Sequence, residues 1–188
     1  ADVNGTSGGS GWSDTWAGAL TIDGETNGPT PVEGTVIAKV PVSNASSATL
    51  DRTLTTATSS GIIRFDMRLT VSDGNLKTAF DGDTLFNEDA VGVMRINGQI
   101  SLETGPGTTY VDLQAYSINT WYRFDLEYDT STDQYRVGID GGAFSSWYNF
   151  RADAARTNIV DMFLQTNNEG GPGTGYWDNI RDGVAPVA

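Results

Sequence analysis

Arginine and acidic residues alternate along two stretches of this sequence in a way that could bind hydroxyl-rich or acidic ligands. The two sets are Arg64, Asp66 and Arg68, and Arg123, Asp125 and Glu127. Arginine presents a planar fork of hydrogen-bond donors that matches carboxylates and paired hydroxyls. A spacing of two residues puts each set on one side of an extended strand. The pattern therefore predicts charged surfaces on strands rather than scattered loop charges.

The chain contains neither histidine nor cysteine. This excludes the Ser–His and Cys–His nucleophile systems, the ordinary zinc and copper sites and any disulfide bond. Any chemistry must use Asp, Glu, Asn, Gln, Arg, Tyr or Trp. The absence of cysteine does not decide between the cytosol and secretion.

The charge of the chain limits its partners. There are 24 acidic and 11 basic residues, which gives a net charge of −13. Such a surface repels nucleic acid and anionic membranes, so we expect neither as a partner. Nine of the basic residues are arginine and two are lysine, and this bias favours an acidic, uronate-containing ligand.

Alternation of apolar and polar residues recurs along most of the chain and predicts β-strands. In residues 61–71, every second position from Ile63 to Val71 is apolar, and the positions between are polar. The predicted strands are residues 35–40, 48–54, 61–71, 90–96, 99–103, 108–114, 121–129, 134–140, 144–150, 159–165 and 175–181. The Asn97-Gly98 pair predicts a tight hairpin between two of them.

Many short strands without alternating helices predict an all-β, two-sheet antiparallel β-sandwich of the jelly-roll type. A length of 188 residues suits one domain, which we expect to span residues 1–188. Within it, residues 1–34 are rich in Gly and Ser, and residues 184–188 read as a linker-like tail. No stretch is apolar enough to predict a transmembrane segment.

Three stretches resemble concanavalin A-like, laminin-G-like β-jelly-roll domains of bacterial secreted proteins. They are residues 8–18 (GGSGWSDTWAG), residues 119–129 (NTWYRFDLEYD) with 135–142 (YRVGIDGG), and residues 175–180 (GYWDNI). The resemblance implies a carbohydrate-binding module of a secreted glycan-degrading protein, tethered to other domains. We expect it to be a monomer. The resemblance also implies a structural Ca²⁺ held by Asp178 with Asp14 or Asp2; a hydrogen bond from the backbone or a Trp N–H would serve Asp178 equally.

The polar faces and exposed aromatics predict a polysaccharide-binding surface. Its candidate residues are Arg64, Asp66, Arg68, Tyr110, Arg123, Asp125, Glu127, Phe163, Gln165 and Trp177. Sugar rings stack on aromatic side chains, and their hydroxyls bridge carboxylate and guanidinium groups. This prediction requires the strands concerned to share one outer face. The alternative is that they divide between two sheets and these residues never meet.

Two enzymatic functions are alternatives to carbohydrate binding without catalysis. Asp125 and Glu127 could be the paired carboxylates of a glycosidase, but the sequence lacks the Glu-x-Asp-x-x-Glu signature of concanavalin A-like glycosidases. A polysaccharide lyase acting on a uronate polymer is the better alternative, with Tyr110 as acid or base. Its remaining candidates are Arg64, Arg68, Arg123 and Gln165. A structural or adhesive β-sandwich is a further alternative. Of these functions, we favour non-catalytic carbohydrate binding.

Overall fold

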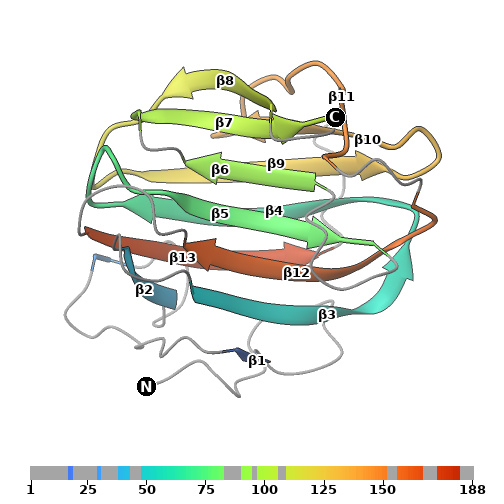
Figure 1. The fold of residues 1–188 in the computed structure, drawn as a ribbon, viewed down its shortest axis with the longest axis horizontal. Helices are drawn as coiled ribbons and strands as arrows, with labels where there is room; N and C mark the ends of the chain where they lie inside the picture. The colour runs from blue at the N-terminus through green and yellow to red at the C-terminus, as the bar shows by residue number, and fades with distance from the viewer. Residues whose placement is uncertain are drawn as a thin grey trace.

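The computed structural model describes residues 17–18, 29–30, 38–42, 48–82, 90–94, 97–105, 109–151, 156–166 and 173–182, and every element in these ranges is a β-strand (Figure 1). The strands are β1 (Ala17–Gly18), β2 (Ala38–Val42), β3 (Ala48–Thr58), β4 (Ser60–Leu69), β5 (Leu76–Asp81), β6 (Ala90–Met94), β7 (Gln99–Thr104), β8 (Thr109–Ala115), β9 (Trp121–Asp129), β10 (Gln134–Ile139), β11 (Tyr148–Asn149), β12 (Ile159–Thr166) and β13 (Gly173–Asp182). Within this part of the chain, no helix is long and apolar enough to cross a membrane.

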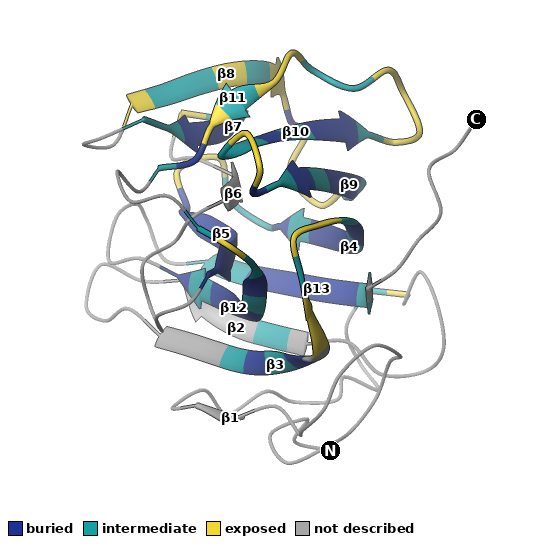
Figure 2. Ribbon diagram, turned by 90° about the vertical axis from the view of Figure 1, so that its right-hand side faces the viewer, coloured by how far each residue is buried: buried dark blue, intermediate teal, exposed yellow. Residues whose placement is uncertain are grey.

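The strands form two antiparallel sheets that pack face to face (Figure 2). The seven-stranded sheet has the order β1-β3-β12-β5-β6-β7-β8, and the six-stranded sheet has the order β11-β10-β9-β4-β13-β2. The last two strands, β12 and β13, lie inside the sheets rather than at their edges. The predicted two-sheet β-sandwich is confirmed.

A cluster of aromatic and aliphatic side chains joins the two sheets. The Phe65 ring on β4 stacks on Phe124 of β9, with centroids 5.1 Å apart, and meets Phe80 of β5 in the other sheet at 6.4 Å. The alternation predicted for β4 and β9 places these side chains in the core, where Phe65, Phe80 and Phe124 are fully buried. Burial of this apolar surface is the main stabilising contribution.

The hairpin predicted at Asn97-Gly98 is present, but its register is centred on Asn97 and does not match a two-residue turn over Asn97 and Gly98. Strands β6 and β7 pair antiparallel on either side of Asn97, with Met94 opposite Ile100. Gly98 has φ 72°, a backbone conformation that glycine adopts without a steric cost.

Strand β5 differs most from the sequence prediction, because it was not predicted at all. Its outward residues, Lys77, Ala79 and Asp81, are weak strand formers. Pairing with β12 on one side and β6 on the other overrides that weak preference. The strand predicted at residues 144–150 is shorter than expected, since pairing is limited to Tyr148–Asn149.

Candidate functional site

The outer face of the six-stranded sheet, here called the arginine face, carries Arg64, Asp66, Arg123 and Asp125. Strands β4 and β9 are neighbours, and their register sets Arg64 opposite Asp125 and Asp66 opposite Arg123. Arg64 Nε donates to Asp125 Oδ1 at 2.6 Å, and Arg123 Nε to Asp66 Oδ1 at 3.3 Å. These residues share one face as predicted, but they pair with one another across the strands.

The remaining charged candidates on this face are also engaged. Arg68 donates to the backbone carbonyl of Asn119 at 2.9 Å and to its side-chain oxygen at 3.0 Å. Glu127 accepts from Arg136 Nε at 2.6 Å. Asp125 and Glu127, the pair considered for a glycosidase, are therefore each tied to an arginine, and an acid–base role for them gains no support.

Asp66 is the most buried carboxylate of the arginine face. Burial raises its pKa, as does the nearby Asp178 carboxylate, while hydrogen bonds from Asn179 and Arg123 oppose that shift. Asn179 Nδ2 donates to Asp66 Oδ2 at 2.9 Å. Donors from Asn179 and Arg123 thus hold the Asp66 carboxylate in place, so its role is structural.

Asp178, the predicted calcium ligand, does not lie on the core face of β13. In the structure Trp177 occupies that face, and Asp178 lies on the outer side, opposite Asp66 in the register. Its Oδ1 accepts the Asn179 backbone N–H at 2.7 Å. Within the described ranges, no group of three or more acidic residues could hold a metal ion. Asp14 and Asp2 lie outside the described residues, so the calcium site stays a prediction.

Trp177 is buried in the core and is therefore not a ligand contact. Its side chain is 0% exposed, because it points between the two sheets. Its indole Nε1 donates to Thr78 Oγ1, on the opposite sheet, at 3.0 Å. The residue is a core anchor.

Phe163, Gln165 and Tyr110 lie on the outer face of the other sheet. Phe163 and Gln165 are on β12 and Tyr110 is on β8, both in the seven-stranded sheet. The single surface predicted from the sequence therefore does not form, and the candidates divide between two outer faces. The residues considered for a lyase are divided in the same way.

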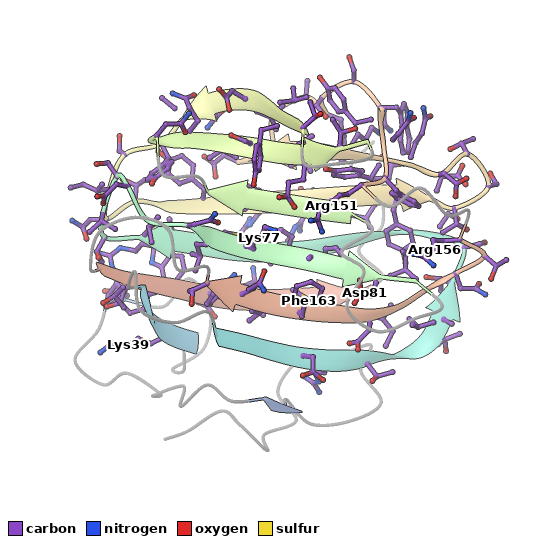
Figure 3. All side chains as sticks on the ribbon, in the orientation of Figure 1. Lys39, Lys77, Asp81, Arg151, Arg156 and Phe163 are labelled. Atoms are coloured by element: carbon purple, nitrogen blue, oxygen red, sulfur yellow. The ribbon has the colours of Figure 1, made fainter. Side chains whose placement is uncertain are left out.

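The outer face of the seven-stranded sheet carries a cluster of charges that the sequence reasoning missed (Figure 3). Lys77 Nζ on β5 lies 3.0 Å from Glu103 Oε2 on β7, and Arg151 Nε lies 3.6 Å from the same oxygen. Lys77 is 3% and Glu103 1% exposed. Charges are rarely buried this far unless they are paired, and burying them costs free energy. We call this surface, with Tyr110, Phe163 and Gln165, the Lys77 face.

Tyr110 shows that the sheet curves toward the Lys77 face. It packs against the cluster of Ala79 and Phe163. Strand β8 is three places from β5 in the sheet order, a separation of about 14 Å if the sheet were flat. Contact over that span requires the face to bend inward, which brings an aromatic ring beside the buried charges.

Two hydrogen bonds fix strand β7 beneath the Lys77 face. The Tyr135 hydroxyl, from the opposite sheet, donates to the backbone carbonyl of Glu103. Ser101 Oγ donates to Asp112 Oδ1 at 2.7 Å, next to a register shift between β7 and β8. Gln165 keeps a buried side-chain oxygen, Oε1, with no hydrogen-bond partner. This oxygen is shielded from solvent, so it is a buried acceptor without a partner.

A pair of carboxylates lies near one end of the Lys77 face. Asp81 and Asp161 are opposite each other on β5 and β12, and they are 1% and 3% exposed. Asp161 Oδ1 accepts the Met162 backbone N–H at 2.7 Å. Figure 3 places Asp81, Lys77, Phe163 and Arg151 over the same sheet.

The sequence held one signal for the missed residues. Leu76, Thr78 and Phe80 alternate with Lys77 and Asp81, and Lys77 is one of two lysines in the chain. That short alternation could have marked a strand with a charged outer face.

The structure was compared with known proteins. No protein-family model matches the sequence, and neither does any curated protein. Among solved structures, a sialidase aligns with a TM-score of 0.68 and 13% identity over 81% of this chain, which corresponds to 16% of the sialidase. A Bacillus licheniformis beta-glucanase aligns at 0.60 with 10% identity over 98% of this chain and 97% of its own. A carbohydrate-binding module from Bacillus subtilis aligns at 0.52 with 11% identity over 90% and 95%.

The chain has the concanavalin A-like sandwich fold. At these identities the likeness concerns the fold alone, since one sandwich fold carries many functions. The fold implied by the three sequence motifs is confirmed.

Proposed function

We propose that this chain is a carbohydrate-binding domain that binds a polysaccharide on the Lys77 face. The observation that carries the proposal is the buried Lys77–Glu103–Arg151 cluster beside Tyr110 on an outer sheet face. Buried, paired charges outside the core cost stability, and such groups concentrate at functional sites. Two neighbours in fold, the Bacillus subtilis module and the beta-glucanase, are carbohydrate-binding or carbohydrate-acting by name.

The residues of the Lys77 face supply both kinds of contact that sugars need. The partly buried Tyr110 ring offers a surface for the apolar side of a pyranose. Arg151, whose side chain is 30% exposed, offers donors to hydroxyls. A glycan lying across the sheet would meet these groups in turn.

The charge of the Lys77 face favours a neutral glycan over the acidic one that the arginine content suggested. Its described cations are two, Lys77 and Arg151. Its described carboxylates are five, on Asp51, Asp81, Glu103, Asp112 and Asp161. A net charge of about −3 repels uronates. The arginines that favoured an acidic ligand pair with acids on the opposite face.

The setting that fits this function is extracellular. We propose that the domain is secreted, acts as a monomer and works attached to other domains of a glycan-degrading protein. The solved carbohydrate-active structures of the same fold support this setting.

Affinity electrophoresis in gels containing xylan, laminarin, pectin or alginate tests the proposal. We expect retardation by a neutral polymer, and at least tenfold weaker binding by Tyr110→Ala and Arg151→Ala, equivalent to about 1.4 kcal/mol. Arg68→Ala is the matched control, because Arg68 lies on the opposite sheet, and it should bind as the wild type does. Equal retardation of all four proteins would show that the Lys77 face is not the site.

One observation favours a second candidate, a polysaccharide lyase. Tyr110 lies opposite Glu103, whose carboxylate meets both Lys77 and Arg151. A deprotonated Tyr110 could accept the proton removed from the sugar, while Lys77 and Arg151 neutralise a uronate. Incubation with pectin or alginate would then give shortened chains with new ultraviolet absorbance from the unsaturated product. Intact polymer after long incubation supports binding alone.

A further inference from the structure

Trp147 is an exposed aromatic residue at the edge of the six-stranded sheet. Its exposed fraction is 38%, and Ile118 is the other large hydrophobic residue classed as exposed in the described ranges. Trp147 directly precedes β11, which is the edge strand next to β10. An exposed indole costs free energy in water unless something covers it.

The indole is held in place from one side. The Arg136 guanidinium lies 4.7 Å from the Trp147 ring centroid and 4.6 Å from the Phe144 ring. Arg136 is fixed in turn by Glu127 at 2.6 Å. The cation covers one face of the indole, and 38% of the residue remains exposed. The ring is thus a pre-ordered platform, which lowers the entropy lost on binding.

Two amide side chains lie beside this platform. Gln134 Nε2 donates to Asn149 Oδ1 at 3.1 Å, and the two residues are opposite each other on β10 and β11. The bond leaves the Gln134 oxygen and an Asn149 N–H without partners in the described part of the chain. Asn149 follows Trp147 by two residues, so both lie on the same side of the strand, roughly 7 Å apart.

We propose that this β11 edge, formed by Trp147, Gln134 and Asn149, is a second carbohydrate site that binds a neutral pyranose. The apolar face of the sugar stacks on the free face of Trp147. Two neighbouring hydroxyls reach the amide pair, one donating to Gln134 and the other accepting from Asn149. Glu127 and Asp129 lie on the neighbouring strand opposite Arg136 and Gln134, and these carboxylates disfavour an acidic sugar. Strands β10 and β11 belong to the six-stranded sheet, whereas Lys77 and Tyr110 lie on the seven-stranded sheet, so ligand binding at the β11 edge does not require a ligand on the Lys77 face.

The test follows the indole N–H signals of ¹⁵N-labelled protein during titration with cellohexaose, xylohexaose, laminarihexaose and mannohexaose. The Trp147→Phe spectrum assigns the Trp147 signal. We expect at least one sugar to shift that signal saturably. The Trp121 and Trp177 signals should stay, because their N–H groups already donate to Thr30 and Thr78. The double variant Gln134→Ala/Asn149→Ala should weaken the response at least fivefold.

The matched control is Ile118→Ala, which removes the other exposed hydrophobic side chain and should leave the Trp147 response unchanged. The Asn149 variant keeps its backbone carbonyl, which the Thr104 hydroxyl bonds at 2.8 Å, so the edge strand stays attached.

The outcomes separate the two sites. A Trp147 response that persists in Tyr110→Ala supports the β11 edge even if the Lys77 face binds nothing. Binding that is lost in Tyr110→Ala while the Trp147 signal never moves overturns the β11 edge and leaves the Lys77 face standing. An unmoved Trp147 signal with all four sugars also overturns it, as does an unchanged affinity in the double amide variant.

Discussion

Arg64 illustrates how a side chain suited to a ligand can be committed to the fold. Its guanidinium donates to Asp125 on the neighbouring strand, and this hydrogen bond raises the pKa of Arg64. Sequence alternation correctly placed both residues on outer positions. It carried no information about their pairing, because the register between β4 and β9 depends on tertiary structure.

Arg64→Ala should therefore affect stability rather than glycan binding. Removal of the guanidinium leaves the Asp125 carboxylate buried without its donor, and we expect a loss of about 1–3 kcal/mol in the free energy of unfolding. Urea titration of Arg64→Ala, Asp125→Ala and the double variant measures the coupling between them. Strictly additive losses, or a loss of polysaccharide binding at unchanged stability, would contradict this assignment.

Individual strands differ in how well the sequence predicted them. Strands β4 and β9 were predicted because long runs alternate large apolar residues with charges, a pattern that only a half-buried strand satisfies. Strand β5 was missed because Ala79 and Lys77 interrupt the usual strand composition. Missing β5 also removed Lys77 and Asp81 from the candidate site.

Alternation assigns a face to a residue, but it does not assign a sheet. Phe163 lies on the outer side of β12 as predicted, but it is only 2% exposed, and its sheet is the one opposite the arginine face. The choice of sheet depends on pairing between distant strands, such as β12 with β3 and β5. The single binding surface expected from the sequence failed for this reason.

The two sheets pack closely where β13 meets β5. A Cβ added to Gly175 would lie 2.3 Å from Leu76 Cδ1, and Leu76 is 0% exposed. Gly175→Ala should therefore destabilise the protein by about 1–3 kcal/mol through overpacking. Urea unfolding of Gly175→Ala, Leu76→Ala and the double variant tests this, because the smaller side chain should make room for the added methyl. If the double variant loses as much free energy of unfolding as the two single variants added together, the contact between Gly175 and Leu76 is unimportant.

At the scale of the whole molecule, the net charge of −13 determines how salt changes the affinity for a charged glycan. A neutral glycan carries no charge to screen, so its affinity should stay within about twofold as ionic strength rises from roughly 0.05 to 0.5 M. An acidic glycan would be repelled at low salt and should bind more tightly as salt is added. Calorimetric titration with both kinds of oligosaccharide distinguishes these cases. A neutral glycan whose affinity falls steeply with salt would contradict the expected mode of binding.

The position of the last two described strands has a consequence for biosynthesis. Strand β12 lies between β3 and β5, and β13 lies between β2 and β4, so each fills a gap between strands made much earlier. Until they emerge from the ribosome, the nascent chain carries unpaired strand edges that could join neighbouring chains. Sheets that close through such distant segments also form slowly, on the scale of milliseconds to seconds. Completion of this sandwich therefore waits for residues 159–182, and the strong negative charge of the chain opposes association of nascent chains before that point.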